Sequence, residues 1–158
     1  VKRVARAIEI YRTSGKTKSE LDRLSREGEC QYDATVIALK YNDRELLYDR
    51  IDRRVDAMIS DGLVEETRGL YEEGIFERST TASQAIGYKE RLGYIKGEMS
   101  LLDASELLKG ATRRYAKRQM TWFSSKDYVR WINADKDGKM RDFDSILEEA
   151  LEVVEGSR

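Results

Sequence analysis

Proline is absent from all 158 residues of the chain, whereas average usage of about 5% would supply about eight. Proline interrupts helices because it lacks the backbone N–H and its ring clashes with the preceding turn. Its absence leaves every helical pattern uninterrupted, and apolar residues recur at helical spacing in several stretches. The chain is therefore predicted to be mainly helical, with helices over residues 2–14, 47–61, 63–73, 84–96, 101–122 and 143–154.

A few short segments have the pattern of strands or loops instead. Thr35–Leu39 is apolar and rich in β-branched residues, which predicts a strand buried on both faces of a parallel sheet. Residues 128–133 alternate as a second strand, 135–139 are predicted to form a turn, and 78–83 a loop. Residues 15–33 are polar and glycine-containing, so they are expected to be a loop or a weak helix and the best domain boundary.

The composition excludes several kinds of catalytic and metal site. The chain contains no histidine and a single cysteine, Cys30, so it has no Cys/His zinc cluster, no histidine-based triad and no internal disulfide. It also lacks the Gly-x-x-x-x-Gly-Lys-Ser/Thr phosphate loop and the Gly-x-Gly-x-x-Gly motif. By itself the chain is predicted to have no metal site and no complete catalytic machinery.

The apolar runs are only a few residues long, far short of the roughly 20 that a membrane span requires. No membrane segment is therefore expected. The N-terminal stretch Val1–Arg6 has neither a hydrophobic signal region nor an initiator methionine. We therefore expect a cytoplasmic protein, of which this sequence is a piece of something longer.

Charge is segregated along the chain although its sum is nearly zero, at 29 Lys+Arg against 30 Asp+Glu. Residues 1–26 contain eight basic and three acidic residues, and residues 107–126 contain six basic residues and no acidic one. Residues 142–155 reverse this balance, with six acidic residues and no basic one. Such a partition suits a protein with one side that faces a polyanion, so nucleic-acid binding is a candidate function.

The first cluster with possible chemistry is Arg50 and Arg54, on the helix that follows the apolar strand. At a spacing of four residues they project from one helix face and could hold a diphosphate by charge-assisted hydrogen bonds. The alternative is a solvated face on which Asp49, Asp52 and Asp56 neutralise the arginines. The position after a strand favours a ligand site, since ligands in open α/β sheets lie beyond the carboxyl ends of strands.

Two further clusters could contact RNA. In the segment Gln84–Lys89, Gln84 could read a base edge, Gly87 permits close backbone approach and Tyr88 could stack on a base, although a core tyrosine beside tightly packed helices is an equal alternative. In Thr112–Phe123, basic residues alternate with aromatic ones, as phosphate neutralisation and base stacking would require. Aromatic residues at helical spacing are more often core, so Tyr115 and Trp122 are expected to be buried and the Arg/Lys face to be functional.

Taken together, these motifs resemble the carboxy-terminal half of the tRNA dimethylallyltransferases, also called tRNA isopentenyltransferases or IPP transferases. The resemblance rests on four stretches in the order of the family: Arg6–Tyr11 followed by Ser-Gly-Lys, Arg50–Asp56 with Gly62–Glu66, Gln84–Glu90, and Thr112–Gln119 running into Thr121–Phe123. These stretches span most of the chain.

The resemblance implies a fold and an activity. The fold would be mainly helical with a few core strands: a fragment of a P-loop NTPase-like, nucleotide-binding (ATP-binding) α/β core plus the end of a helical insertion. Residues 1–33 would be the end of the insertion that grips tRNA, and 34–158 the carboxy-terminal part of the core. The family transfers a dimethylallyl group from dimethylallyl diphosphate to N6 of the adenosine immediately 3′ of the anticodon, assisted by Mg²⁺. The phosphate loop, the Asp general base and most of the Mg²⁺ site would lie in an absent amino-terminal half, so this fragment alone is expected to be an inactive monomer.

The resemblance also assigns roles residue by residue. Arg50 and Arg54 match the position expected for the diphosphate of the donor. The residues that match tRNA-contacting segments, or share their basic helix, are Lys2, Arg3, Arg6, Gln84, Ala85, Ile86, Gly87, Tyr88, Lys89, Arg113, Arg114, Lys117, Arg118, Gln119, Met120, Thr121, Trp122, Phe123 and Ser124. The partner would be the anticodon stem-loop of tRNA.

Two alternatives remain. A non-catalytic RNA-binding helical module would explain the basic helix but not the strand that leads into Arg50 and Arg54. A helical protein-interaction domain would explain the amphipathic helices but not the absence of acidic residues from 107 to 126.

Overall fold

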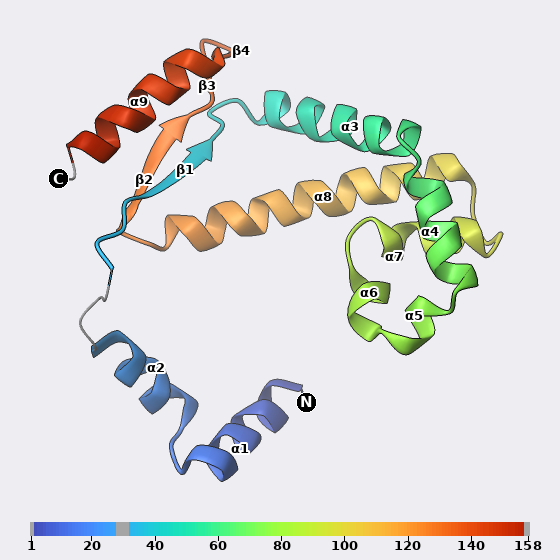
Figure 1. The fold of residues 1–158 in the computed structure, drawn as a ribbon, viewed down its shortest axis with the longest axis horizontal. Helices are drawn as coiled ribbons and strands as arrows, with labels where there is room; N and C mark the ends of the chain where they lie inside the picture. The colour runs from blue at the N-terminus through green and yellow to red at the C-terminus, as the bar shows by residue number, and fades with distance from the viewer. Residues whose placement is uncertain (1, 28–31, 157–158) are drawn as a thin grey trace. The chain divides into compact units, whose positions relative to one another are not determined.

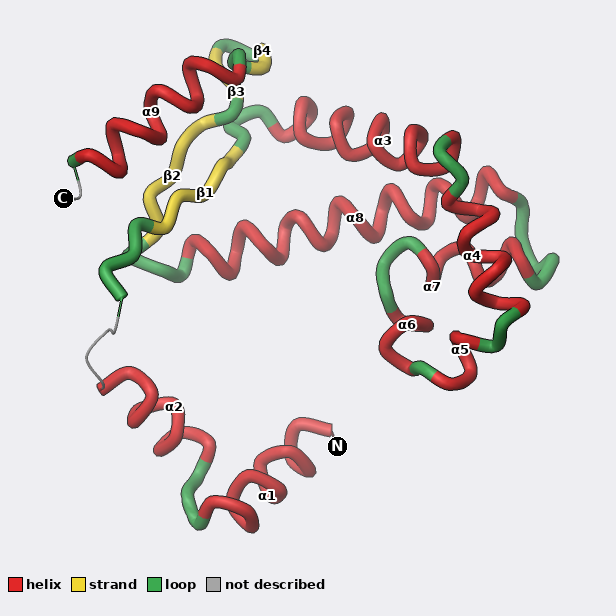
Figure 2. The backbone as a smooth tube through the Cα atoms, viewed as in Figure 1, coloured by secondary structure: helices red, strands yellow, loops and turns green. Residues whose placement is uncertain are grey.

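The computed structural model of the chain describes residues 2–27 and 32–156 (Figure 1). Most of these residues lie in helices and few in strands, as Figure 2 shows by colour, so the prediction of a mainly helical chain is confirmed. The chain forms two compact units, Val1–Ala34 and Thr35–Arg158. Their assignment to a tRNA-gripping insertion and a catalytic core stays a prediction. No helix in the described part of the chain is both long and apolar enough to cross a membrane.

The first unit consists of α1 (Lys2–Ser14), which has the predicted bounds, and α2 (Lys18–Glu27). Thr17 caps α2: its hydroxyl accepts a hydrogen bond from the Glu20 backbone N–H, and the Glu20 carboxylate accepts one from the Thr17 N–H at 2.7 Å. Residues 15–33 were expected to form either a loop or a weak helix, and residues 18–27 form the helix. Cys30 lies outside the described residues.

In the second unit, β1 (Val36–Lys40) and β2 (Val129–Asn133) form a parallel pair, with Val36 opposite Val129 and Lys40 opposite Asn133. The parallel pairing agrees with the prediction. The expected burial of the first strand on both faces is wrong, because Leu39 is 53% exposed. Within the described residues the sheet has only these two strands, so one edge of each is unpaired.

The strand β1 leads directly into α3 (Arg44–Ser60), as predicted, and α3 packs against the antiparallel helix α8 (Leu101–Ser124) (Figure 1). Asp43 caps α3 by accepting a hydrogen bond from the Glu45 N–H at 2.8 Å. The carboxylate of Asp135 accepts hydrogen bonds from the backbone N–H groups of Asn42 and Asp43, at 2.7 and 2.9 Å. Because Asp135 follows β2, these bonds fix the turn from β1 into α3 against the end of the second strand.

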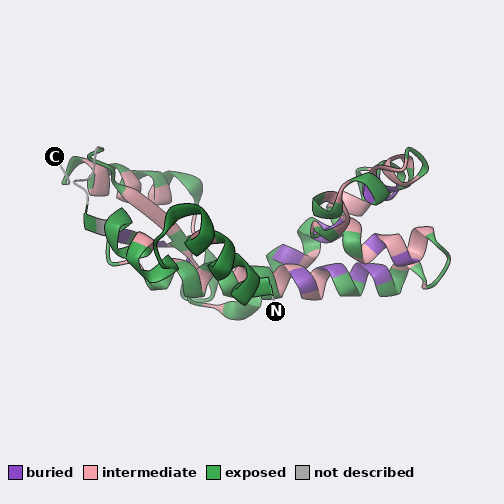
Figure 3. Ribbon diagram, turned by 90° about the horizontal axis from the view of Figure 1, so that it is seen from below, coloured by how far each residue is buried: buried purple, intermediate pink, exposed green. Residues whose placement is uncertain are grey.

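The hydrophobic core of this unit centres on Val55, Leu63 and Leu108. Figure 3 shows buried segments along the packed helices, and β2 also has buried residues, Val129 and Ile132. The buried residues of α8 all lie in its first half: Ala104, Ser105, Leu108 and Ala111. The second half of α8 therefore extends beyond the helices that cover the first.

Four shorter helices follow α3 in the chain and precede α8: α4 (Leu63–Glu72), α5 (Ile75–Arg78), α6 (Thr80–Gln84) and α7 (Tyr88–Ile95). The first matches the predicted helix that ends before Gly74. The loop predicted over 78–83 is wrong, because Ser79 caps a helical turn by accepting from the Ala82 N–H. The helix predicted over 84–96 is confirmed over Tyr88–Ile95, but its start is wrong, because the backbone leaves the helical region at Ala85 and Gly87.

Gly93 lies inside α7, where glycine costs roughly 1 kcal/mol relative to alanine. A Cβ atom at this position would lie 2.5 Å from the methyl carbon of Met99. The glycine therefore lets the segment after α7 turn back closely onto the helix.

After β2, the chain forms a hairpin of β3 (Asp135–Lys136) and β4 (Lys139–Met140), where a turn was predicted, and then α9 (Phe143–Glu155). The Arg141 guanidinium ties the hairpin to α9 by donating to the Asn133 carbonyl at 2.9 Å and the Glu149 carboxylate at 2.6 Å. Phe143, Leu147 and Leu151 form an apolar stripe on α9 that stays exposed.

Arg91 in α7 is fully buried. One of its terminal nitrogens donates to the Gly87 carbonyl at 3.3 Å, but Nε and the other terminal nitrogen have no hydrogen-bond partner among the described residues. Burial lowers the pKa of the guanidinium, with a smaller opposing effect of Glu90. A buried cation with unmet donors is a cost to stability.

Replacing Arg91 with methionine, which keeps an unbranched apolar stem and removes the charge, should therefore raise the free energy of unfolding by about 1–3 kcal/mol. Urea denaturation of the purified chain measures this change. Arg68→Met is the matched control, because Arg68 lies exposed on α4 and its loss should change stability by less than about 0.5 kcal/mol. A loss of stability in Arg91→Met would show that the guanidinium makes net favourable interactions.

Candidate nucleic-acid interface

Arg50 and Arg54 are exposed on α3 and make no hydrogen bond or ion pair with any described residue. The acids that could have neutralised them are engaged elsewhere. Asp49 pairs with Arg53, Asp52 pairs with Arg113, and Asp56 pairs with Lys109 at 2.8 Å. The two guanidinium groups are therefore solvated and have no acidic partner in the described part of the chain, and their binding of a diphosphate stays a prediction.

Arg54 borders a cavity of about 470 Å³ between α3, α8 and the break before α7. Its lining is mostly apolar and brings together members of all three predicted clusters: Ile51, Arg54, Val55, Met58, Ile86, Gly87, Leu108, Thr112 and Tyr115. Arg54 is the one charged residue of this lining, and Arg50 is not part of it. The cavity thus combines an apolar interior with a single cation.

The break at Ala85–Gly87 depends on glycine. Gly87 has φ 110° and ψ −54°, a backbone conformation that residues with a Cβ rarely adopt. Its N–H donates to the Glu90 carboxylate at 2.9 Å, and its carbonyl accepts from Arg91. The turn leaves the Gln84, Ile86 and Lys89 side chains exposed, so this part of the predicted segment can meet a partner.

Tyr88 is placed differently from its neighbours. Its ring lies 5.7 Å from that of Phe76, and its hydroxyl donates to the Glu66 carboxylate at 2.5 Å, which raises the pKa of Tyr88. It packs against the core cluster. The alternative of a core tyrosine, rather than a stacking platform, is the one that the contacts favour.

The basic residues of α8 do not form one free face, as the sequence had suggested. Lys109 and Arg113 turn toward α3, where Arg113 donates through Nε to Asp52 at 3.0 Å and Lys109 pairs with Asp56. The free cations are Arg114, Lys117 and Arg118, which line a shallow groove of about 680 Å³ with Thr121, Trp122 and Ser125. A smaller set of cations than predicted is therefore open to a polyanion.

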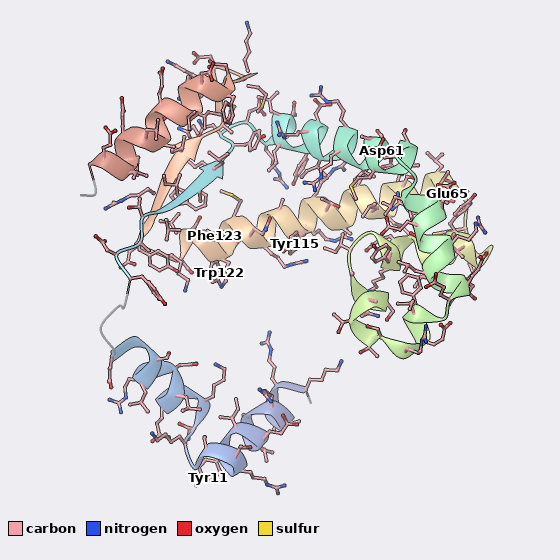
Figure 4. All side chains as sticks on the ribbon, in the orientation of Figure 1. Tyr11, Asp61, Glu65, Tyr115, Trp122 and Phe123 are labelled. Atoms are coloured by element: carbon pink, nitrogen blue, oxygen red, sulfur yellow. The ribbon has the colours of Figure 1, made fainter. Side chains whose placement is uncertain are left out.

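The expected burial of Tyr115 and Trp122 is wrong, because their exposed fractions are 46% and 56%. Figure 4 shows Tyr115 midway along α8, with Trp122 and Phe123 at its carboxyl-terminal end. Both exposed rings have a cation over them: Arg118 lies 5.5 Å from the Tyr115 ring centre, and Lys126 lies 5.0 Å from that of Trp122. Helical spacing predicted which face of α8 carries Leu108 and Ala111, but not that the burial of this face ends before Tyr115.

The other candidate tRNA-contacting residues are mostly exposed. Lys2, Arg3 and Arg6 lie on α1, where Arg6 pairs with Glu9 at 3.1 Å. On α8, Gln119, Thr121 and Ser124 are exposed, whereas Met120 and Phe123 are half-buried. Ala85 is half-buried within the turn. Their contacts with RNA stay a prediction.

No group of three or more His, Cys, Asp or Glu side chains is arranged to hold a metal ion within residues 2–27 and 32–156. The expectation of Mg²⁺ stays a prediction, and no step of the chemistry is assigned to a metal held by this chain.

Comparison with known proteins identifies the family. The family model of the IPP transferases matches residues 1–126. The chain belongs to the IPP transferase family. A tRNA dimethylallyltransferase of Acetivibrio thermocellus is 50% identical over 136 residues, covering 86% of this chain and 43% of the relative. One of Caldanaerobacter subterraneus is 40% identical over 157 residues, covering 99% of this chain and 49% of the relative.

A solved structure has the same fold. The tRNA delta(2)-isopentenylpyrophosphate transferase of Staphylococcus epidermidis matches 98% of this IPP transferase chain and 48% of its own chain, with 41% identity and a TM-score of 0.72. The chain thus spans about half the length of the curated relatives it matches.

The turn at Gly87 offers a test of local geometry. Gly87→Ala should destabilise this IPP transferase chain by about 1–3 kcal/mol, because alanine is strained at φ 110° although nothing within 4 Å would meet its Cβ. Gly69→Ala is the matched control: Gly69 lies in α4, also with nothing within 4 Å, and helical alanine should stabilise by about 0.5–1 kcal/mol. Thermal or urea unfolding of both variants measures the opposite signs. Equal effects would mean that the turn tolerates a side chain.

Proposed function

We propose that this chain is the carboxy-terminal half of a tRNA dimethylallyltransferase. The reaction would form a bond between N6 of the adenosine immediately 3′ of the anticodon and the first carbon of the dimethylallyl group. The bond from that carbon to oxygen breaks, diphosphate leaves, and N6 loses a proton to a base outside this chain. Membership of the family and the names of the relatives support this assignment.

The observation that carries the proposal is the cavity beside Arg54. A dimethylallyl group is small and apolar, and the diphosphate attached to it is strongly anionic. The lining of this cavity has the matching character, an apolar interior with one guanidinium at its margin. Ile86 and Gly87 line the same cavity, so a base held by the Gln84–Lys89 segment would face the donor.

The free guanidinium groups of Arg50 and Arg54 would stabilise the negative charge that grows on the departing diphosphate. Their lack of acidic partners matters here, because an ion pair would have to be broken before they could bind it. The adenosine has to leave its stack to reach the donor, at a cost of a few kcal/mol that contacts with the RNA backbone must offset.

The remaining half of the enzyme would complete the sheet. Free-standing parallel pairs are rare, because parallel sheets are normally covered on both faces. Here β1 and β2 keep unpaired edges within the described residues, and α9 keeps an exposed apolar stripe. We therefore expect the absent half to supply further strands of a P-loop NTPase-like core, with the phosphate loop, the general base and the Mg²⁺ ligands. The intact enzyme is expected to be a cytoplasmic monomer, and this chain alone to be inactive.

In the intact enzyme, Arg54→Ala should lower kcat/KM by about 10²-fold or more, because one stabilising contact to the leaving diphosphate is lost. Steady-state prenylation of an anticodon stem-loop measures this. Arg53→Ala is the control on the same helix, since Arg53 pairs with Asp49 on the exposed surface and should have little effect. Wild-type kinetics in Arg54→Ala would contradict the diphosphate-binding role and show that Arg54 is only a solvated surface residue.

Recognition of RNA should separate into two kinds of residue. Arg118→Ala should flatten the dependence of log K on log salt by about 0.7–0.9, because one phosphate contact is lost. Gln84→Ala should leave this slope unchanged but weaken binding of the cognate stem-loop by about 1–3 kcal/mol, if its amide reads a base edge. Filter binding to cognate and scrambled stem-loops across a salt series measures both. Equal losses of affinity for the two RNAs in Gln84→Ala would instead show that this segment positions the RNA backbone. An intact protein that binds the stem-loop but does not prenylate it would be a non-catalytic RNA-binding module.

A further inference from the structure

A further cavity lies between the start of α3 and the second half of α8. Arg113 and Lys117 on its α8 side are candidate tRNA contacts, whereas Tyr41, Arg44 and Tyr48 on its other side have no role so far. The cavity has a volume of about 290 Å³. Tyr41 and Arg44 follow β1 at the start of α3, and Arg113, Lys117 and Met120 of α8 line the same cavity. The cavity therefore lies beyond the carboxyl end of a parallel strand, where open α/β sheets place their ligands.

Two guanidinium groups are fixed around one ring in this cavity. Arg44 donates through Nε to the Tyr48 hydroxyl at 2.7 Å, and its guanidinium carbon lies 4.9 Å from the centre of the Tyr48 ring. The Arg113 guanidinium lies 5.4 Å from the same ring centre and donates a hydrogen bond through Nε to the Asp52 carboxylate. Both groups are thus positioned by neighbouring side chains before any ligand enters, which reduces the entropy lost on binding.

The positive charge in this cavity is not balanced. Its lining contains three cations and no acidic residue. The carboxylate of Asp52 offsets one charge, that of Arg113. The terminal nitrogens of Arg44 and the ammonium group of Lys117 have no hydrogen-bond or ion-pair partner among the described residues. Two positive charges in a partly enclosed space attract an anion with several oxygens.

We infer that this cavity is a phosphoryl-binding pocket, in which Arg44 and Lys117 contact the anion, Tyr48 holds Arg44 in place, and Arg113 lies over the same ring. Planar guanidinium groups match the oxygen geometry of phosphate, and lysine supplies a point charge beside them. The inference deepens the proposed function and rests on it in one respect: the phosphoryl group would belong either to the diphosphate donor or to the RNA backbone. The pocket is separate from Arg50 and Arg54, which do not line it.

Inorganic pyrophosphate is the probe for the pocket itself. Calorimetric titration into the purified chain at low salt should give saturable binding, weakened about tenfold or more in Arg44→Gln and in Lys117→Gln. Lys117 makes no hydrogen bond or ion pair with a described residue, so its replacement removes charge without breaking a contact that holds the fold. Arg53→Gln is the matched control, because it removes one charge from the same helix outside the cavity and should leave pyrophosphate affinity unchanged.

Absence of saturable binding by the wild-type chain would overturn the inference. Equal weakening in Arg53→Gln would also overturn it, because the anion would then respond to overall charge rather than to this cavity.

The intact enzyme distinguishes the two sources of the phosphoryl group. If the donor diphosphate occupies the pocket, Arg44→Gln should raise the KM for dimethylallyl diphosphate about tenfold and leave the salt dependence of stem-loop binding unchanged. If an RNA phosphodiester occupies it, the slope of log K against log salt should fall by about 0.7–0.9 while the KM for the donor stays constant. Either result supports the pocket. If Arg44→Gln changes neither the KM for the donor nor the salt slope, the pocket takes no part in prenyl transfer. An intact wild-type enzyme that prenylates no stem-loop would overturn the proposed function, while the pyrophosphate titration would still decide the pocket.

Discussion

The packing of α3 (Arg44–Ser60) against α8 (Leu101–Ser124) determines where every candidate functional group of the second unit lies. Apolar contact around Val55 and Leu108 is flanked by two cross-helix ion pairs, Asp52 with Arg113 and Asp56 with Lys109. These pairs fix the rotation of one helix relative to the other. As a result the Arg54 cavity opens where the break before α7 meets both helices, and the cationic cavity opens beside the start of α3. A change in this packing would displace both cavities together.

The same ion pairs decide which cations are free. The chain is nearly neutral overall, with a net charge of −1, so whether a cation of α3 is free depends on how the acids beside it are engaged. Asp52 and Asp56 are used to hold α8, and Asp49 is used by Arg53. This leaves Arg50 and Arg54 on α3 without partners among residues 2–27 and 32–156. Structural pairing and anion binding are thus linked: the acids that stabilise the helix pair are unavailable to neutralise the arginines.

Periodicity in the sequence predicted most of the helices, including α1, α4 and α9, and the direct step from β1 into α3, because these depend on local pattern. It missed features that depend on distant or missing neighbours. The pairing of Arg113 depends on Asp52, 61 positions away, and no helical pattern reveals such a partner. The break at Gly87 was hidden because a glycine fits both a costly helix position and a turn. Arg44 was missed because it lies at a helix start whose neighbouring helix, α8, comes much later in the chain. The burial of Trp122 was wrong because spacing gives the face of a helix but not the length of its cover.

The chain spans about half the length of its relatives and has exposed apolar side chains. The charges beside these side chains indicate whether protein or RNA would cover them in the proposed enzyme. The stripe of Phe143, Leu147 and Leu151 on α9 lies in a segment whose charged side chains are all acidic. RNA would be repelled there, so in the proposed enzyme this surface belongs against protein. Trp122 is equally exposed, but it lies beside Lys126 and the free cations Arg114 and Arg118. An aromatic ring among uncompensated cations suits a nucleic acid, because one partner can then satisfy both the apolar face and the charge. In the proposed enzyme, the acidic C-terminal helix would therefore face protein and the basic end of α8 would face RNA.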